Sequence, residues 1–353
     1  MRTKRRRCVR HALAALSVVF ILLLDTCAPA GSPGANVRAP ARDSIDPRII
    51  LRARLSHGFG ASPFDDLLWT DSRHAAILVV AASGAPEDEL LALASRPDSG
   101  RARLARLVER KLLVRDATTF RPSFPILADE RATAYYALVE MAAHEVMTVF
   151  SPSLDSLLIE LHRRGWSDWG YHFLWSQLID SQFAWVEMIE RGLVPPLSTV
   201  VAWVVYPEHP WKTGTNLVPE ESADHFLAIS WTPGGSSLAR LYDDWRPIYT
   251  SALAGAPADS ATATTLRALE LISEDGTLQI PVVRADDPLH RFLRELSGRM
   301  VSAMADALPH AQLRALTGLE SHLVFAVAYH DLGWEVLRLA AESGRVRRPP
   351  GLE

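Results

Sequence analysis

The stretch Leu104–Leu127, LARLVERKLLVRDATTFRPSFPIL, joins a leucine-striped helix to two short extended runs. Leu104 and Leu107 recur at helical spacing, and charged residues occupy most of the remaining surface of that helix. The run that follows alternates around a polar turn at Asp116, which predicts a short β-hairpin. The stretch therefore predicts an α+β protein, mostly helical, in which helices pack against small hairpins.

Upstream, SPFDDLLWTDSRHAAILVVAAS (62–83) and PEDELLALAS (86–95) predict two more helices, and Asp98 or Ser99 is expected to cap the helix at 101–113. The order helix, helix, turn, helix and hairpin resembles the winged-helix (helix-turn-helix) fold of bacterial transcription regulators over about residues 62–128. The resemblance implies that basic side chains of the last helix and hairpin contact phosphates. They are Arg101, Arg103, Arg106, Arg110, Lys111, Arg115 and Arg121. The alternative is a solvated face on a fold reused for protein contact.

A second copy of this pattern follows downstream. TLRALELISEDGTLQIPVV (265–283) again combines a leucine-rich helix, a turn at Asp275-Gly276 and an extended run that contains a proline. The two runs also end alike, in FPILADE and IPVVRADD. We therefore expect a second winged-helix-like unit at about 237–286.

The N-terminus has the pattern of a secretory signal. Six basic residues stand within the first eleven, and Ala12–Leu24 is an uncharged, mostly apolar run of thirteen. This run is shorter than the about 20 residues that a membrane-spanning helix needs. We expect residues 1–26 to be a signal peptide that sends the rest of the chain to the cell envelope, outside the cytoplasm.

Leu24–Cys27, LDTC, resembles the lipobox at which a bacterial lipoprotein is cut and lipidated, although small residues are usual where Asp25 and Thr26 stand. The second cysteine, Cys8, lies inside the signal, so a chain that begins at Cys27 has no internal disulfide. We expect lipidation of Cys27 to anchor the protein to the membrane. Cleavage after Ala30, which leaves a periplasmic protein, is the alternative.

Charge argues against a general polyanion-binding protein. The chain has 37 basic and 41 acidic residues, and removal of residues 1–26 leaves 31 and 40, a net charge of −9. Phosphate backbones attract proteins through an excess of positive charge. We therefore do not expect nucleic acid to be a partner.

The chain divides by composition into four parts after the signal. Residues 27–45 are rich in Ala, Pro, Gly and Arg and predict a flexible tether. We expect a winged-helix-like unit at 46–130, a tryptophan-rich module at 131–236, and the second unit with C-terminal helices at 237–353. Those helices are expected at about 288–308 and 320–343.

The middle module holds seven of the ten tryptophans, namely Trp166, Trp169, Trp175, Trp185, Trp203, Trp211 and Trp231. Residues 169–192 predict one long helix closed by Gly192. Residues 198–207 and 225–231 predict two strands of a β-hairpin around the loop 208–224. The module is therefore expected to combine a tryptophan-rich helix with a hairpin.

Candidate ligand-binding residues lie in this module. On the predicted helix, His172, Ser176 and Asp180 form one stripe, and Trp211, Lys212 and Asn216 lie in the loop. We expect Trp211 and Lys212 at the mouth of a concave site whose wall carries His172 and Asp180, because aromatic walls with a few polar groups are typical of ligand sites. The alternatives are a solvent or interdomain face for the stripe and a plain turn at Asn216.

Local motifs exclude several enzyme classes. Lys212-Thr213-Gly214 resembles the Lys-Thr-Gly motif of serine β-lactamases, but no Ser-x-x-Lys exists. The pairs His144-Glu145 and His330-Asp331 lack metalloprotease spacing, and no Cys-x2-Cys or dinucleotide fingerprint occurs, so we expect no metal and no cofactor.

We therefore expect a non-enzymatic role, with the tryptophan-rich module binding a protein partner or an apolar or sugar-like ligand. Two alternatives stay open. One is a membrane-tethered winged-helix regulator that binds DNA, and the other is an enzyme with a dispersed site that uses His172, Asp180 and Lys212.

Overall fold

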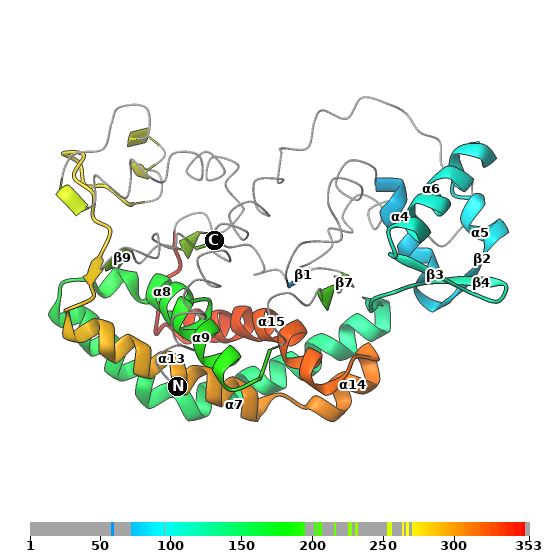
Figure 1. Ribbon diagram of the computed structural model, residues 1–353. Coiled ribbons are helices and arrows are strands. Elements are labelled where there is room, and N and C mark those ends of the chain that lie inside the picture. Colours follow the sequence, from blue (N-terminus) through cyan, green and yellow to red (C-terminus); the bar gives the residue numbers. More distant parts are fainter. Residues whose placement is uncertain are drawn as a thin grey trace, which may run out of the picture.

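The computed structural model describes residues 72–194 except Ser95, residues 270–349, and short segments between and before them: 58–59, 201–202, 204–206, 215–216, 225–227, 230–231, 253–255, 263–264 and 266–267. Helices dominate these residues, and the largest sheet has three antiparallel strands. The expected α+β class, mostly helical, is confirmed. Figure 1 shows a small unit, in blue and cyan, joined to a larger helical body.

The small unit has its own apolar core, which runs from Ile77 to Ile126. Its sheet has the strand order β2-β4-β3, and β3 pairs with β4 in the register Arg115↔Phe120. Phe120 lies under the guanidinium of Arg115, so the hairpin covers the core with an aromatic ring. The elements are α4 (Ser72–Val80), β2 (Ala85–Pro86), α5 (Glu87–Leu91), α6 (Pro97–Glu109), β3 (Leu113–Asp116) and β4 (Thr119–Pro122).

Helix α6 begins and ends earlier than the sequence predicts. It starts at Pro97, with Arg96 as the N-cap in place of Asp98 or Ser99, because proline has no N–H to leave unpaired and its fixed φ suits the first helical position. It ends at Glu109 because Lys111 has a φ of 58°, so the Leu112 amide turns back to donate to the carbonyl of Leu107 at 2.9 Å. Strand β3 can then leave directly from the helix.

The helical body has one continuous apolar core, to which its long helices contribute. Helix α7 packs against both α13 and α15, and α13 also contacts the segment 174–190 (Figure 1). The predicted helices near 288–308 and 320–343 correspond to α13 and α15, whereas α14 was not expected. The bounds are α7 (Asp129–Arg163), α8 (Gly170–Phe173), α9 (Gln182–Glu190), α13 (Pro288–Ala307), α14 (His310–Thr317) and α15 (Ser321–Glu342).

Helix α7 is 35 residues long and continues through Pro152. Proline removes one backbone hydrogen bond and usually ends or kinks a helix. Here Phe150, Leu154 and Leu157 keep the apolar stripe in register on both sides of Pro152, and all three are at most 2% exposed. Burial of this stripe outweighs the missing hydrogen bond, so the helix continues.

The single helix predicted for 169–192 is divided into three parts. Helix α8 runs into a π-helix at Leu174–Ile179, the chain extends at Ser181, and α9 follows. The Ser181 hydroxyl caps α9 by accepting from the Ala184 amide at 3.0 Å. Gly192 does close the segment with a φ of 68°, as expected.

The strands of the middle module do not form the hairpin that the sequence predicts. Strand β7 (Val204–Tyr206) pairs in parallel with β5 (Ile126–Ala128), and β6 (Val201–Ala202) pairs with β1 (Gly58–Phe59). Strand β9 (His225–Leu227) pairs with β11 (Val282–Arg284). Alternating apolar residues identify a strand but not the strand that it pairs with. Here the partners of β6, β7 and β9 come from outside the module. Among the described residues, the pairing that joins two segments of the module is β8 (Thr215–Asn216) with β10 (Ser230–Trp231).

Some expectations fall outside the described residues. They are the signal peptide, Cys27, the tether, residues 62–71 of the first predicted helix, Trp203, Trp211, Lys212 and most of residues 237–265. Within the part of the chain that is described, no helix has the length and apolar character needed to cross a bilayer.

Candidate functional site

Asp180 ends a π-helix and does not continue the regular α-helix that the sequence predicts. The Asp180 amide donates to the carbonyl of Trp175 at 2.8 Å, five residues back. A regular α-helix would place Asp180 above Ser176, in one stripe with His172. The wider turn instead ends at Asp180, which is the C-cap residue with a φ of −102° and a ψ of 54°, so its side chain no longer follows the α-helical spacing. π-Turns of this kind often occur at functional sites.

Gly333 brings α15 close to the π-helix. A Cβ atom at Gly333 would lie 2.5 Å from Cγ2 of Ile179 and 3.2 Å from Cζ3 of Trp175. Only glycine leaves room for so close a contact in the middle of a helix. The neighbouring Tyr329 hydroxyl donates to the carbonyl of Ile179 at 2.5 Å, at the end of the π-helix.

Two polar side chains from two other helices then converge on Asp180. The indole N–H of Trp185, on α9, donates to Oδ1 of Asp180 at 3.0 Å. Nε2 of His330, on α15, lies 3.5 Å from the same oxygen. The side chains of Asp180 and His330 are 13% and 9% exposed, so the pair lies just beneath the surface.

Aromatic rings enclose this pair. The ring of His330 lies 5.6 Å from that of Trp185, 5.8 Å from that of Tyr329 and 6.4 Å from that of Trp175. Trp175 in turn stacks on Trp334 at 3.5 Å. We call Asp180, Trp185, His330 and the surrounding Trp175, Tyr329 and Trp334 the aromatic–carboxylate cluster.

Burial and the nearby charge on Asp180 both affect the pKa of Tyr329. Burial, followed by the charge on Asp180, raises the pKa of Tyr329, so that hydroxyl stays protonated and remains a donor. A carboxylate among indole and phenol rings offers an acceptor for hydroxyl or N–H groups, and the rings offer faces for apolar or sugar surfaces. The cluster is therefore chemically suited to bind a ligand that has both polar and apolar parts.

Asp180 belongs to the cluster, whereas His172 and Asn216 lie elsewhere, and Trp211 and Lys212 fall outside the described residues. His172 is 8% exposed and its ring packs 4.8 Å from that of Trp169. Ser176, also buried, donates to the carbonyl of His172 at 2.5 Å. His172 and Ser176 are therefore both buried, and the alternative of a solvent-exposed face does not hold for them. Asn216 lies in β8, with its backbone paired to Ser230.

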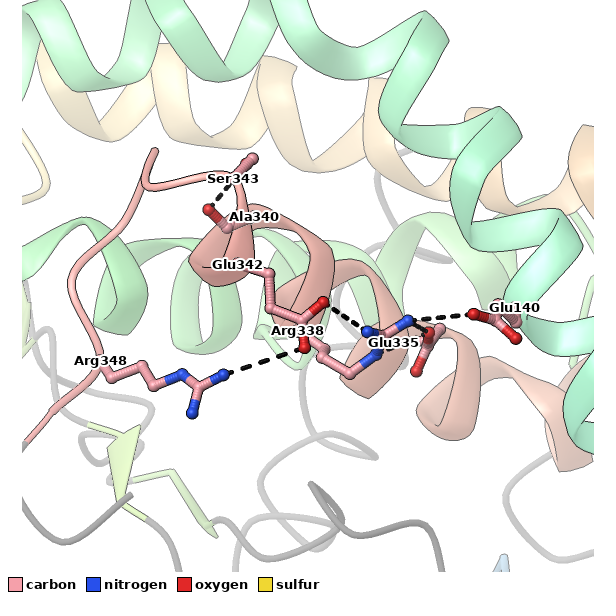
Figure 2. Close-up of polar contacts among 7 residues, drawn as sticks. All are labelled: Glu140, Glu335, Arg338, Ala340, Glu342, Ser343 and Arg348. Carbon is pink, nitrogen blue, oxygen red and sulfur yellow. Dashed lines mark hydrogen bonds and ion pairs between the residues drawn. The ribbon is translucent and has the colours of Figure 1, made fainter. Parts of the chain in front are cut away.

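A charged network borders the cluster farther along α15 (Figure 2). Arg338 binds Glu335 on its own helix through a 2.8 Å hydrogen bond from Nε, and it reaches Glu342 at 2.5 Å and Glu140 of α7 at 3.3 Å. Its carboxylate partners raise the pKa of the Arg338 guanidinium above its usual value. Because Glu335 is only 4% exposed, its pairing with Arg338 satisfies a buried charge, and the contact with Glu140 joins α15 to α7.

Sequence reasoning missed the contribution of His330, Tyr329 and Trp334. The available signal was the polar pair His330-Asp331 inside the apolar helix LVFAVAYHDLGWEVL (323–337). Asp331 is 1% exposed and accepts a hydrogen bond from Tyr135 of α7 at 2.8 Å. Ionisable residues are rarely buried in this way without a specific partner.

Among the residues that the structure describes, no three His, Cys, Asp or Glu side chains are placed to hold a metal ion. No family model, curated protein or solved structure matches the chain.

Proposed function

We propose that this chain is an exported, lipid-anchored envelope protein whose helical body binds a ligand without transforming it. The convergence of Asp180, Trp185 and His330 inside an aromatic enclosure carries the binding role. The N-terminal signal pattern and Cys27 carry the location. The ligand has apolar or sugar-like surface together with hydrogen-bonding groups.

Binding is favoured over catalysis because of how His330 is enclosed. A general base must reach the proton that it removes from a substrate. The His330 ring is surrounded by Trp175, Trp185 and Tyr329, and the nearest oxygen of Asp180 already accepts a hydrogen bond from the Trp185 indole. Such a pair is better placed to orient a bound group than to exchange protons with it.

We also propose that residues 72–122 form a winged-helix unit that serves protein contact. The order of its elements and its strand order β2-β4-β3 support this. A second unit at about 237–286 is supported by the backbone at 266–271. Glu270 has a φ of 56°, and the Leu271 amide donates to the carbonyl of Leu266 at 2.9 Å, as the Leu112 amide does to the carbonyl of Leu107.

A second candidate function is a membrane-tethered DNA-binding regulator. The observation that favours it is the basic exposed surface of α6 and the β3–β4 hairpin, which carries Arg101, Arg106, Arg110, Lys111, Arg115 and Arg121. Acidic neighbours moderate this charge, since Arg101 lies 3.5 Å from Asp98 and Arg121 lies 3.8 Å from Asp116. A regulator of this kind must face the cytoplasm, whereas a lipoprotein body faces away from it.

The location is tested by labelling the lipid. Cells that express the full chain are grown with a labelled fatty acid, and the protein is fractionated with the envelope. We expect label in the wild-type protein and none in Cys27→Ala, because the thiol is the acylation site. Export without label indicates cleavage after Ala30. A body that is found only in the cytoplasm contradicts the export proposal and favours the regulator.

The binding role is tested at Asp180. A ligand at about one hundred times its Kd stabilises a protein by about 2.7 kcal/mol, which raises the melting temperature by several degrees. We expect at least one of a panel of mono- and disaccharides to do this for the wild type. Asp180→Asn keeps the shape but removes the charge, so its shift should be lost. Asp155→Asn on α7, where the carboxylate is 55% exposed, is the matched control and should keep the shift. A shift that is equal in all three proteins rules out this site.

A further inference from the structure

Residues 343–349 leave the end of α15 and turn back against the helical body, and we call them the C-terminal strap. Gly344 has a φ of 71°, and the amides of Arg345 and Val346 donate to the carbonyl of Ala340 at 3.0 and 3.3 Å. A left-handed glycine of this kind is a common helix ending, and it changes the direction of the chain. The side chains that follow then attach the strap to other elements.

Two arginines of the strap reach acidic residues from separate parts of the chain. Nη1 of Arg345 lies 3.2 Å from Oδ1 of Asp155 on α7. Arg347 lies 3.6 Å from Asp168, in the short turn before α8, and 2.7 Å from Glu270. All five side chains are between 32% and 74% exposed. Ion pairs in such exposed positions are weak and are screened by salt, so this part of the attachment depends on ionic strength.

Between the two arginines, Val346 attaches the strap through an apolar contact. It is 4% exposed, and its Cγ1 atom would lie 3.2 Å from a Cβ atom at Gly170, the first residue of α8. The next residue of α8, Tyr171, is 1% exposed. Burial raises the pKa of Tyr171, and the charge on Arg348 acts against this shift, which indicates that Arg348 lies near the phenol. The strap therefore covers the start of α8.

The strap is held less firmly than the helix that it follows. In the last turns of α15, Val336, Leu337 and Ala340 are all 0% exposed, within the continuous core of the body. In the strap, one valine is buried and the arginines on either side of it form exposed pairs. Segments with few buried apolar contacts open locally, at a much lower free energy than global unfolding. The strap is thus the part of this region that can separate first.

We propose that the C-terminal strap is a salt-sensitive clasp, which opens while the helical body stays folded and then exposes Tyr171 at the start of α8. The clasp gives the protein a closed state and an open state, and the ionic strength of the surroundings sets the balance between them. This proposal is independent of the ligand-binding role proposed above.

Opening is measured by limited proteolysis of the full-length protein. Trypsin can cut after Arg345 and Arg347 when the strap leaves the body, and mass spectrometry quantifies the released peptides 346–353 and 348–353. Between 0.1 and 1 M salt the Debye length falls from about 10 to about 3 Å, so we expect release about threefold faster or more. An unstructured arginine peptide corrects for the effect of salt on trypsin, and circular dichroism verifies that the body stays folded.

A double variant tests the ion pairs without removing a cleavage site. Asp168→Asn with Glu270→Gln removes both acidic partners of Arg347, so release at 0.1 M salt should be about two- to tenfold faster than in the wild type. The matched control is Asp98→Asn, which removes an 89% exposed carboxylate that lies 3.5 Å from Arg101 in the small unit. The control should release the peptides at the wild-type rate.

Nitration by tetranitromethane, mapped by mass spectrometry, tests whether the strap covers Tyr171. We expect Tyr171 to react faster in the double variant than in the wild type. The internal control is Tyr135, which is 0% exposed and donates to Asp331 within the body, and it should stay protected in both proteins.

Three results overturn the proposal. Peptide release at the same rate in the wild type and the double variant shows that the ion pairs do not hold the strap. Release that accelerates only together with nitration of Tyr135 shows that the strap opens only when the body unfolds. Faster release with Tyr171 still protected shows that the strap does not cover that residue.

Discussion

Gly333→Ala is expected to lower the free energy of unfolding by about 1–3 kcal/mol, because the added methyl overpacks the contact between α15 and the π-helix. The methyl carbon would meet Cγ2 of Ile179 at 2.5 Å and the ring of Trp175 at 3.2 Å. Both neighbours are fully buried and cannot swing into solvent. The displacement would also separate His330 from Asp180, so binding of any sugar probe should weaken together with stability.

The matched control is the same substitution at Gly298, in the interior of α13. There the nearest atom to an added Cβ is Cδ of Glu187 at 3.9 Å, the end of a flexible side chain. Alanine is a better helix former than glycine by about 0.5–1 kcal/mol, so Gly298→Ala should stabilise the protein. Urea unfolding of both variants measures the difference. Stabilisation by both substitutions would show that α15 does not approach the π-helix as closely as described.

Local sequence patterns were enough to predict an element where its apolar residues recur at a regular spacing. The leucine stripe and polar turn of 104–122 predicted α6 and its hairpin, and amphipathic spacing predicted α13 and α15 to within a residue or two. Each of these elements has one apolar side that faces one core. The spacing of the apolar residues then shows directly which side of the element is buried.

Helix α7 and the π-helix could not be predicted in this way. SPSLDS at 151–156 has the composition of a helix end, and only packing of Phe150 and Leu154 against the rest of the body overrides Pro152. A π-turn has no recognised single-sequence signal, yet it removes Asp180 from the regular helix. An ideal 100° rotation per residue therefore assigned Asp180 to the stripe of His172.

The candidate site depends on contacts that no local pattern encodes. Asp180 and His330 are 150 residues apart, and they meet because Gly333 admits the π-helix. The sequence marked Asp180 and the polar pair at 330–331 separately. Bringing them together required the packing of α15 against both α7 and the 174–190 segment.

Asp287→Ala is expected to lower the free energy of unfolding by about 2–4 kcal/mol. Asp287 is the N-cap of α13, where its carboxylate accepts from the Leu289 amide at 2.8 Å, and loss of such a cap costs about 1 kcal/mol. The same carboxylate binds the Arg164 guanidinium through two 2.7 Å hydrogen bonds and so joins α13 to the end of α7. Hydrogen bonds to charged groups contribute about 1.5–3 kcal/mol, and Glu160, 2.8 Å from Arg164, retains part of the pairing.

Asp287→Asn separates the two contributions, because asparagine caps a helix about as well as aspartate but carries no charge. Its cost should be about 1–2 kcal/mol, from the weakened pairing with Arg164 alone. Urea unfolding at neutral pH measures both variants. Equal losses in the two variants would assign the whole effect to the ion pair and none to the cap.

The pH dependence provides an independent check on the ion pair. Hydrogen bonding to Arg164 lowers the pKa of Asp287 below its usual value, against the opposing effect of burial. A carboxyl group with a lowered folded-state pKa contributes stability above its unfolded pKa of about 3.9, and this contribution is lost as the pH falls through the folded pKa. The difference in stability between wild type and Asp287→Asn should therefore be constant above about pH 5 and disappear as the solution becomes more acidic than the folded pKa. A difference that persists after full protonation would mean that Asp287 acts through shape and capping, and that charge does not hold α13 to α7.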